Sequence, residues 1–115
     1  MTTQPSTELP IFTRFYNFTA WLIPAIEKFP RTQRFMLSSR LLDSTFACHA
    51  HLIRARKVTG AARAETLLQA DVTLDTLRLQ LRLAHDLRCL STNQYEQGAS
   101  LLNQVGKLLG SWRKG

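Results

Sequence analysis

Histidines and cysteines are the first residues to consider, because their spacing could place metal ligands on one helical face. Cys48 and His51 stand three residues apart, and His85 and Cys89 stand four apart. Two such pairs facing each other would form a Cys2His2 zinc site. We expect no metal site, because antiparallel neighbouring helices put Cys48 and Cys89 at different heights. Free cysteines inside apolar helical patterns are commonly small buried hydrophobic residues.

Catalytic patterns give no support for an enzyme. The sequence has no H-E-x-x-H motif, no phosphate-binding glycine loop and no G-x-S-x-G motif. Its acidic residues are scattered and form no obvious acid–base pair. We therefore expect a non-catalytic protein without a cofactor. Only two cysteines are present, which favours a reducing compartment over a secreted disulfide scaffold.

Basic residues dominate the charged set. Lys+Arg 15 against Asp+Glu 8 gives a formal net charge of +7 and a pI near 10.3. The excess predicts an anionic partner such as nucleic acid, and the alternatives are an acidic protein or a face that meets only solvent. Cations near a helix C-terminus also complement its dipole, which gives some of them a structural role. The candidate contact residues are Arg31, Arg34, Arg40, Arg54, Arg56, Lys57 and Arg63.

Arg78 and Arg82 form a second candidate contact, four residues apart on one helical face. Asp75 and Asp86 stand at spacings that allow ion pairs with them, each contributing about 0.2–0.5 kcal/mol. A solvated, ion-paired stripe is the simpler interpretation. Leucines flank both arginines, however, so they emerge at the margin of buried surface. From there we expect them to reach a partner.

Four amphipathic helices must position these residues. We expect them from about Pro10 to Phe29, from Thr32 to Val58, from Ala62 to Leu90, and from Ser91 to the end, after a disordered lead at residues 1–8. Pro30 ends the first, and Ser91 with Gln94 predicts a capping box at the last. No segment alternates with period two, so no sheet is expected. The short connections predict an all-α, up-down-up-down antiparallel four-helix bundle over residues 9–115.

The third helical segment is apolar on two sides. One line comprises Leu67, Leu74, Leu77, Leu81 and Ala84, and a second comprises Leu68, Val72, Leu79, Leu83, Leu87 and Leu90. Because the bundle core can cover one line, the second predicts a contact between subunits through Leu79 and Leu83. The last segment has a neutral polar outer face with Gly98, Gly106 and Gly110. These glycines predict close approach of another surface, and we expect a homo-oligomer.

Membrane insertion is not expected, because no apolar run approaches the roughly 18 residues that a span requires. The N-terminal residues are polar and lack the apolar core of a signal peptide. We therefore expect a cytoplasmic protein.

Four places in the sequence together resemble the Avd proteins, the accessory variability determinants of diversity-generating retroelements. The string Val105-Gly106-Lys107-Leu108-Leu109-Gly110-Ser111-Trp112 is similar to the end of that family's fourth helix. Leu22-Ile23-Pro24 with Phe29-Pro30-Arg31 resembles its kinked first helix and proline break. Leu77-Arg78 with Leu81-Arg82, preceded by Asp71, resembles its third-helix Leu-Arg pairs. The resemblance covers Leu9 to Gly115, with a shorter basic tail than some relatives carry.

This resemblance implies a basic four-helix bundle that assembles into a ring-like homopentamer. Such bacterial or phage-encoded proteins bind the retroelement's reverse transcriptase together with RNA and DNA. They support error-rich cDNA synthesis during mutagenic retrohoming and are not catalytic themselves. Two alternatives remain open at this point: a bundle of the kind encoded by intervening sequences of 23S ribosomal RNA, and a basic oligomeric protein-interaction module. Fold alone does not separate them.

Overall fold

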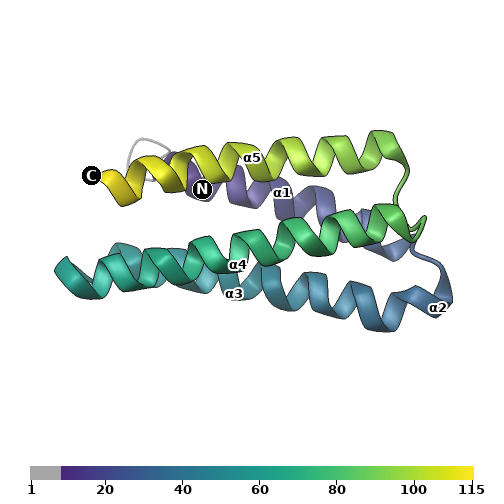
Figure 1. Cartoon of the computed structure of the whole chain (residues 1–115), viewed down its shortest axis with the longest axis horizontal. Helices are drawn as coiled ribbons and strands as arrows, with labels where there is room; N and C mark the ends of the chain where they lie inside the picture. Colours follow the sequence, from purple (N-terminus) through teal and green to yellow (C-terminus); the bar gives the residue numbers. More distant parts are fainter. Residues whose placement is uncertain (1–8) are drawn as a thin grey trace, which may run out of the picture.

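The structure, a computed structural model, describes residues 9–115 and, for residues 33–35, the backbone only. Four helical segments make up these residues (Figure 1), which confirms the all-α prediction. They are α1 (Pro10–Glu27), a continuous segment formed by α2 (Arg31–Gln33), the π-helical η2 (Arg34–Ser38) and α3 (Ser39–Lys57), then α4 (Gly60–Asp86) and α5 (Thr92–Lys114). The expected lead at residues 1–8 lies outside the described residues.

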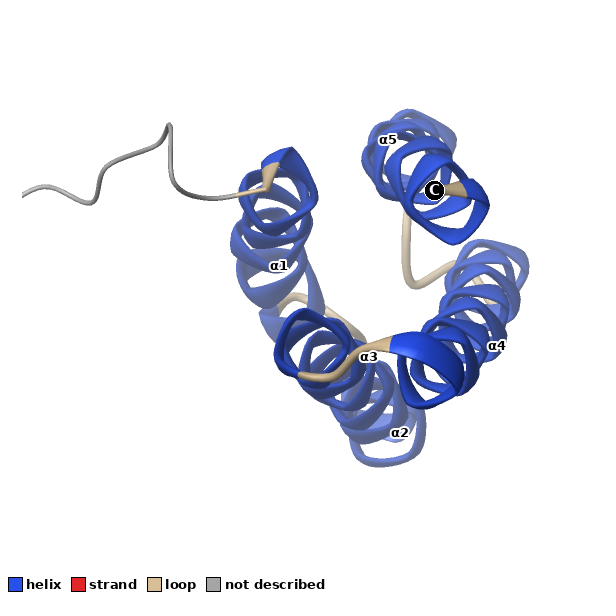
Figure 2. Cartoon of the chain, turned by 90° about the vertical axis from the view of Figure 1, so that its left-hand side faces the viewer, coloured by secondary structure: helices blue, strands red, loops and turns tan. Residues whose placement is uncertain are grey.

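Successive helical segments alternate in direction, as the up-down-up-down prediction requires (Figure 1). Helix α3 packs along α4, α4 along α5, and α5 along α1, whereas α1 touches α3 more sparsely. Viewed end-on, the four helices surround one interior (Figure 2). The first turn of α1 lies beside the last turns of α5, so one end of the bundle combines both with the α3–α4 turn (Figure 1).

The core comes from the lines of apolar residues that the sequence predicts. The buried line of α1 comprises Ile11, Phe15, Phe18, Leu22 and Ile26, and the buried line of α4 comprises Leu67, Leu74, Leu77, Leu81 and Ala84. Helix α5 contributes Leu102, Val105 and Leu109. No helix in the described part of the chain is both long and apolar enough to cross a membrane.

The corner between α4 and α5 differs in detail from the sequence-based expectation. Helix α4 ends at Asp86 rather than at Leu90, because Arg88 adopts a left-handed conformation with φ 66°. The amide of Cys89 then donates to the carbonyl of Ala84 at 2.7 Å, which closes the helix end. The predicted capping box is present: Ser91 Oγ accepts from the Gln94 amide, and the Gln94 side chain accepts from the Ser91 amide.

Candidate nucleic-acid and partner interface

The basic residues of the second helical segment do not form one patch. Arg31 and Arg40 lie near its start, and Arg54 and Lys57 lie near its end, at the opposite end of the bundle. All four side chains are exposed, whereas the side chain of Arg34 lies outside the described residues. The structure therefore divides this set into two groups separated by the length of α3.

Two members of the set have roles within the chain. The Arg63 Nε donates to the carbonyl of Ala55 at 2.9 Å, so it satisfies an acceptor in the last turn of α3. The Arg56 guanidinium lies 4.4 Å from the ring centre of Phe12 in a cation–π contact. Phe12 also contacts Trp112 edge to face, so Arg56 belongs to an aromatic cluster at this end of the bundle. Neither residue is a purely solvent-facing cation.

Arg78 and Arg82 lie in different surroundings. Arg78 forms an ion pair with Asp75 at 2.9 Å, and its side chain is 39% exposed. Arg82 is 73% exposed and lies 3.8 Å from Asp86, a weaker contact. Both intrahelical pairs are those that the spacing suggests. Of the two arginines, Arg78 is the one held against neighbouring protein.

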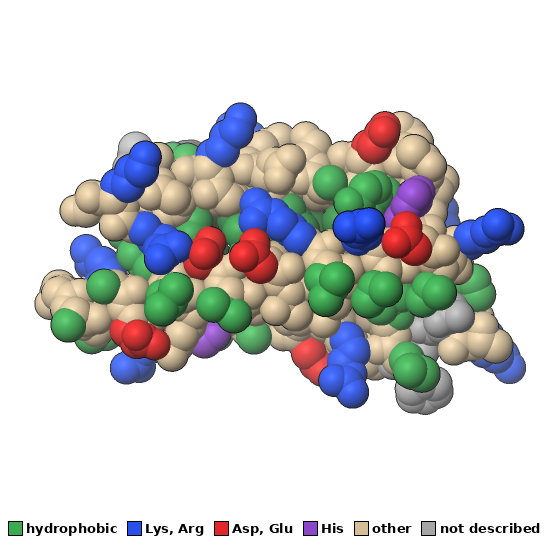
Figure 3. Space-filling view, in the orientation of Figure 1, with side chains coloured by type: hydrophobic (Ala, Val, Ile, Leu, Met, Phe, Trp, Pro, Cys, Tyr) green, Lys and Arg blue, Asp and Glu red, His purple; other side chains and the backbone are tan. Residues whose placement is uncertain are grey.

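A cross-helix ion pair is absent from the sequence-based interpretation. Arg113, near the end of α5, pairs with Asp71 of α4 at 3.0 Å. Basic and acidic side chains follow the seam between α4 and α5, where these two helices meet (Figure 3). No short-range pattern could reveal this pair, because its partners stand 42 residues apart in the chain.

Two of the three glycines predicted at a subunit interface have neighbours inside the chain. At Gly98 a methyl group would lie 2.5 Å from the Trp21 ring and 3.0 Å from Leu81. At Gly106 a methyl group would overlap the Arg78 guanidinium. Only Gly110 of the three faces open space. Packing of Trp21 and Leu81 within one chain thus accounts for the glycine at position 98, whereas a side chain at position 106 would displace the end of the Arg78 side chain.

The second apolar line of α4 is largely exposed in the single chain. Leu79 is 58% exposed and Leu83 is 41% exposed, and Leu68, Val72 and Leu87 are exposed with them, whereas Leu90 is buried. These five exposed residues form what we call the α4 stripe. A band of hydrophobic side chains runs along this part of the surface (Figure 3). An exposed apolar row of this length on a helix is typical of a protein contact.

The cysteine and histidine pairs are held apart. The buried Cys48 thiol lies 3.6 Å from the carbonyl of Ala70. Ala70 is about 20 Å along α4 from Ala84, the residue whose carbonyl accepts from the Cys89 amide. Among the described residues, no group of three or more His, Cys, Asp or Glu could hold a metal ion. Burial, reinforced by the charge of Asp71, raises the pKa of the Cys48 thiol to about 12.

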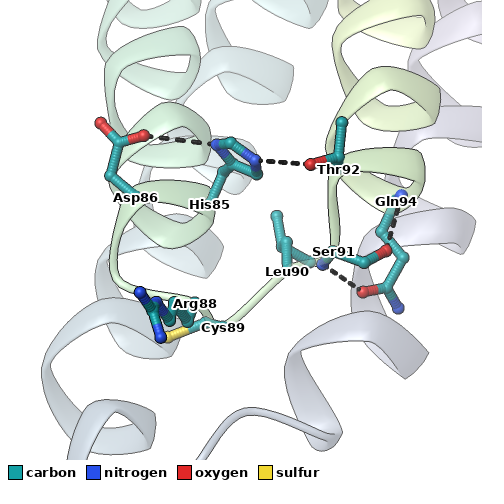
Figure 4. Close-up of a pocket in the computed structure, with 8 residues that line it drawn as sticks. All are labelled: His85, Asp86, Arg88, Cys89, Leu90, Ser91, Thr92 and Gln94. Atoms are coloured by element: carbon teal, nitrogen blue, oxygen red, sulfur yellow. Dashed lines mark hydrogen bonds and ion pairs between the residues drawn. The ribbon is translucent and has the colours of Figure 1, made fainter.

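A hollow of about 760 Å³ lies at the corner between α4 and α5. Figure 4 shows that its polar groups bond mainly to one another: His85 bridges Asp86 and Thr92, and Ser91 bonds Gln94. Cys89 is also there, and burial raises the pKa of its thiol, which makes it a weaker nucleophile at neutral pH. These interactions suit a helix corner better than a catalytic site.

A row of polar side chains on α5 lines a hollow that is not among the sites predicted from the sequence. Ser100, Asn103, Gln104 and Lys107 line it together with Gly106, and Arg78 of α4 completes it. Their spacing of three, four and seven residues marks one helical face, which is the signal that could have found them. The sequence alone indicated only that this face is largely neutral and polar.

Comparison of the sequence with models of known protein families assigns the chain to one family. A family model described as bAvd-like matches residues 9–115. The chain belongs to the bAvd-like family. This match confirms the resemblance to the Avd proteins, and it makes the chain an Avd-type accessory protein, a class that is generally non-catalytic. The comparison with curated proteins found no match. In this bAvd-like chain, the seam between α4 and α5 carries charged side chains, and the α4 stripe is exposed.

Proposed function

We propose that this bAvd-like protein binds the reverse transcriptase of a diversity-generating retroelement, together with RNA and DNA. In this role it supports mutagenic cDNA synthesis and retrohoming in the cytoplasm of its host, without catalysing a step itself. The family match over residues 9–115 is the observation that carries the proposal. The net charge of +7 and the exposed cations at both ends of the bundle support it.

Binding to nucleic acid should proceed mainly through phosphates. Each neutralised phosphate releases counterions, so the logarithm of the affinity should fall with the logarithm of salt concentration by roughly 0.7–0.9 per contact. Fluorescence anisotropy with labelled RNA and DNA at several salt concentrations measures this slope. An affinity that does not change with salt would contradict a phosphate-based mechanism.

Arg78 and Arg82 are the residues that we propose for contact with the reverse transcriptase or its bound nucleic acid. Replacing both with Ala removes two exposed ion pairs, each contributing less than about 1 kcal/mol, so the fold should persist. Pull-down of the reverse transcriptase and cDNA yield should both fall sharply. The matched control replaces Arg54 and Lys57, because Arg56 packs on Phe12 and its loss would disturb the aromatic cluster. Equal losses in both variants would mean that only net charge matters.

A second copy of the chain is the occupant that we propose for the α4 stripe, with the family's pentamer as the expected assembly. Light scattering should give about five times the chain mass of 13.1 kDa. Leu79→Glu with Leu83→Glu should yield folded monomers, because both side chains are exposed in one chain. Tyr16→Glu is the control, since Tyr16 is 71% exposed on α1, away from the stripe. An unchanged mass for the leucine variant would refute the assignment.

A further inference from the structure

The polar hollow between α4 and α5 has an unusual set of lining groups. Its volume is about 540 Å³, and it lies against the middle of α5. Arg78 and Lys107 supply two cations, and Ser100, Asn103 and Gln104 supply neutral hydrogen-bonding groups. No carboxylate is among these lining residues. The hollow therefore presents a net positive charge, because Lys107 adds to an Arg78 that is paired with Asp75 outside the lining. It also presents groups that both donate and accept hydrogen bonds.

The lining groups of α5 are free to bind a ligand. Within residues 9–115, the side chains of Ser100, Asn103, Gln104 and Lys107 make no hydrogen bond or ion pair with the rest of the chain. From Ser100 to Lys107 the row extends about 10 Å along the helix. That length matches two or three nucleotides of a strand at about 3.4 Å each.

Arg78 is positioned from two sides. One terminal nitrogen of its guanidinium bonds the Asp75 carboxylate at 2.9 Å. The other terminal nitrogen lies over Gly106, in space that any side chain there would fill. The remaining N–H groups stay available for a ligand, because a guanidinium carries five donors. A preorganised arginine loses less conformational freedom on binding than a freely moving one.

We propose that this hollow is a binding site for the sugar–phosphate backbone of a nucleic-acid strand. Arg78 and Lys107 contact phosphate oxygens, while Ser100, Asn103 and Gln104 bond sugar hydroxyls or further phosphate oxygens. The carboxylates of an acidic protein segment need donors alone, whereas the amide and hydroxyl groups of the hollow can also accept a hydrogen bond from a ribose 2′-OH. The inference rests on the proposed function and names the site through which it binds nucleic acid.

The first test compares two pairs of substitutions that remove the same charge. Arg78→Gln with Lys107→Gln removes both cations of the hollow, and Arg14→Gln with Lys114→Gln removes two exposed cations outside it. Anisotropy with labelled single-stranded RNA and DNA of one sequence gives affinity and salt slope. We expect the hollow variant to bind at least ten-fold more weakly, with a slope smaller by about 1.4–1.8 for two lost contacts. The control should change less than three-fold.

The second test uses the contact between Gly106 and Arg78. Gly106→Ala displaces the guanidinium without changing the net charge, so it should also weaken RNA binding several-fold. In the Arg78→Gln background the same substitution should have little further effect, because its target is already gone. Equal effects of Gly106→Ala in both backgrounds would mean that it acts through the helix rather than through Arg78, and would overturn the site. Circular dichroism and light scattering of each variant check its fold and mass, which we expect to be unchanged.

The outcomes separate this inference from the proposed function. If the unsubstituted protein binds neither RNA nor DNA at low salt, the proposed function fails and the site with it. If it binds both but the hollow and control pairs lose equal affinity, only bulk charge acts and the site alone is refuted. Polyglutamate serves as the acidic-protein probe. If the hollow variant loses polyglutamate binding and keeps nucleic-acid binding, the hollow is a protein-docking site and the inference is wrong.

Discussion

Two glycines of α5, Gly98 and Gly110, allow the packing cost of the same Gly→Ala substitution to be compared at a packed and at an open position. Changing Gly98 or Gly110 to Ala adds one methyl group and raises helix propensity by up to about 1 kcal/mol in each case. At Gly110 the methyl group meets open space. At Gly98 it would lie 2.5 and 2.7 Å from two carbons of the Trp21 ring and 3.0 Å from Leu81. The two variants therefore differ chiefly in the packing cost at Gly98.

The packing cost can be estimated from these contacts. Contacts this short require the Trp21 ring or the α5 backbone to move, and inserting a methyl group into packed surroundings costs about 1–3 kcal/mol. Moving the ring also lengthens its hydrogen bond to Gln97, which is already 3.4 Å. We expect Gly98→Ala to be about 2 kcal/mol less stable than Gly110→Ala. For a chain of this size the difference corresponds to about 8 °C in Tm.

Thermal and urea unfolding followed by circular dichroism, at one protein concentration, measure this difference. Tryptophan fluorescence in a Trp112→Phe background reports on Trp21 alone and should shift to the red in Gly98→Ala as the ring moves toward water. Light scattering should show an unchanged mass, because the Gly98 contact is within one chain. Equal stabilisation by both substitutions would refute the described packing of α1 on α5.

Three further predictions concern the helix ends and the buried thiol. Arg88→Gly should raise Tm by about 4 °C in a thermal scan, because Arg88 occupies a left-handed conformation that glycine adopts without strain. Ser91→Ala removes the acceptor of the Gln94 amide and should lower the free energy of unfolding by about 1 kcal/mol in urea titration. Burial raises the pKa of the Cys48 thiol to about 12, so the folded state holds this proton more tightly than the unfolded state does. The resulting stabilisation of the folded state is complete below about pH 9 and is lost as the pH rises toward 12. Between pH 8 and about 10.5, the free energy of unfolding of the unsubstituted protein should therefore fall by more than that of the Cys48→Ala variant. An identical pH dependence of the two proteins would show that Cys48 is not buried.

Local patterns in the sequence determined much of this protein. Helix periodicity predicted the four helical segments, because it depends on residues three and four apart. The same short range fixed the capping box of Ser91 and Gln94 and the intrahelical pair of Asp75 and Arg78. The leucine lines of α4 likewise distinguished a buried side from a second apolar side that a single chain leaves exposed.

The tertiary structure decided everything that depends on the rotation and height of one helix against another. The sequence grouped the cations of the second helical segment, but the length of α3 separates Arg40 from Arg54 at opposite ends. It suggested interface glycines, yet Gly98 and Gly106 face Trp21 and Arg78 of their own chain. The pairing of Asp71 with Arg113 and the joining of Arg78 to the polar row of α5 arise only when α4 and α5 pack side by side. Periodicity gives the face of each helix, whereas contact between faces is set by packing of the whole core.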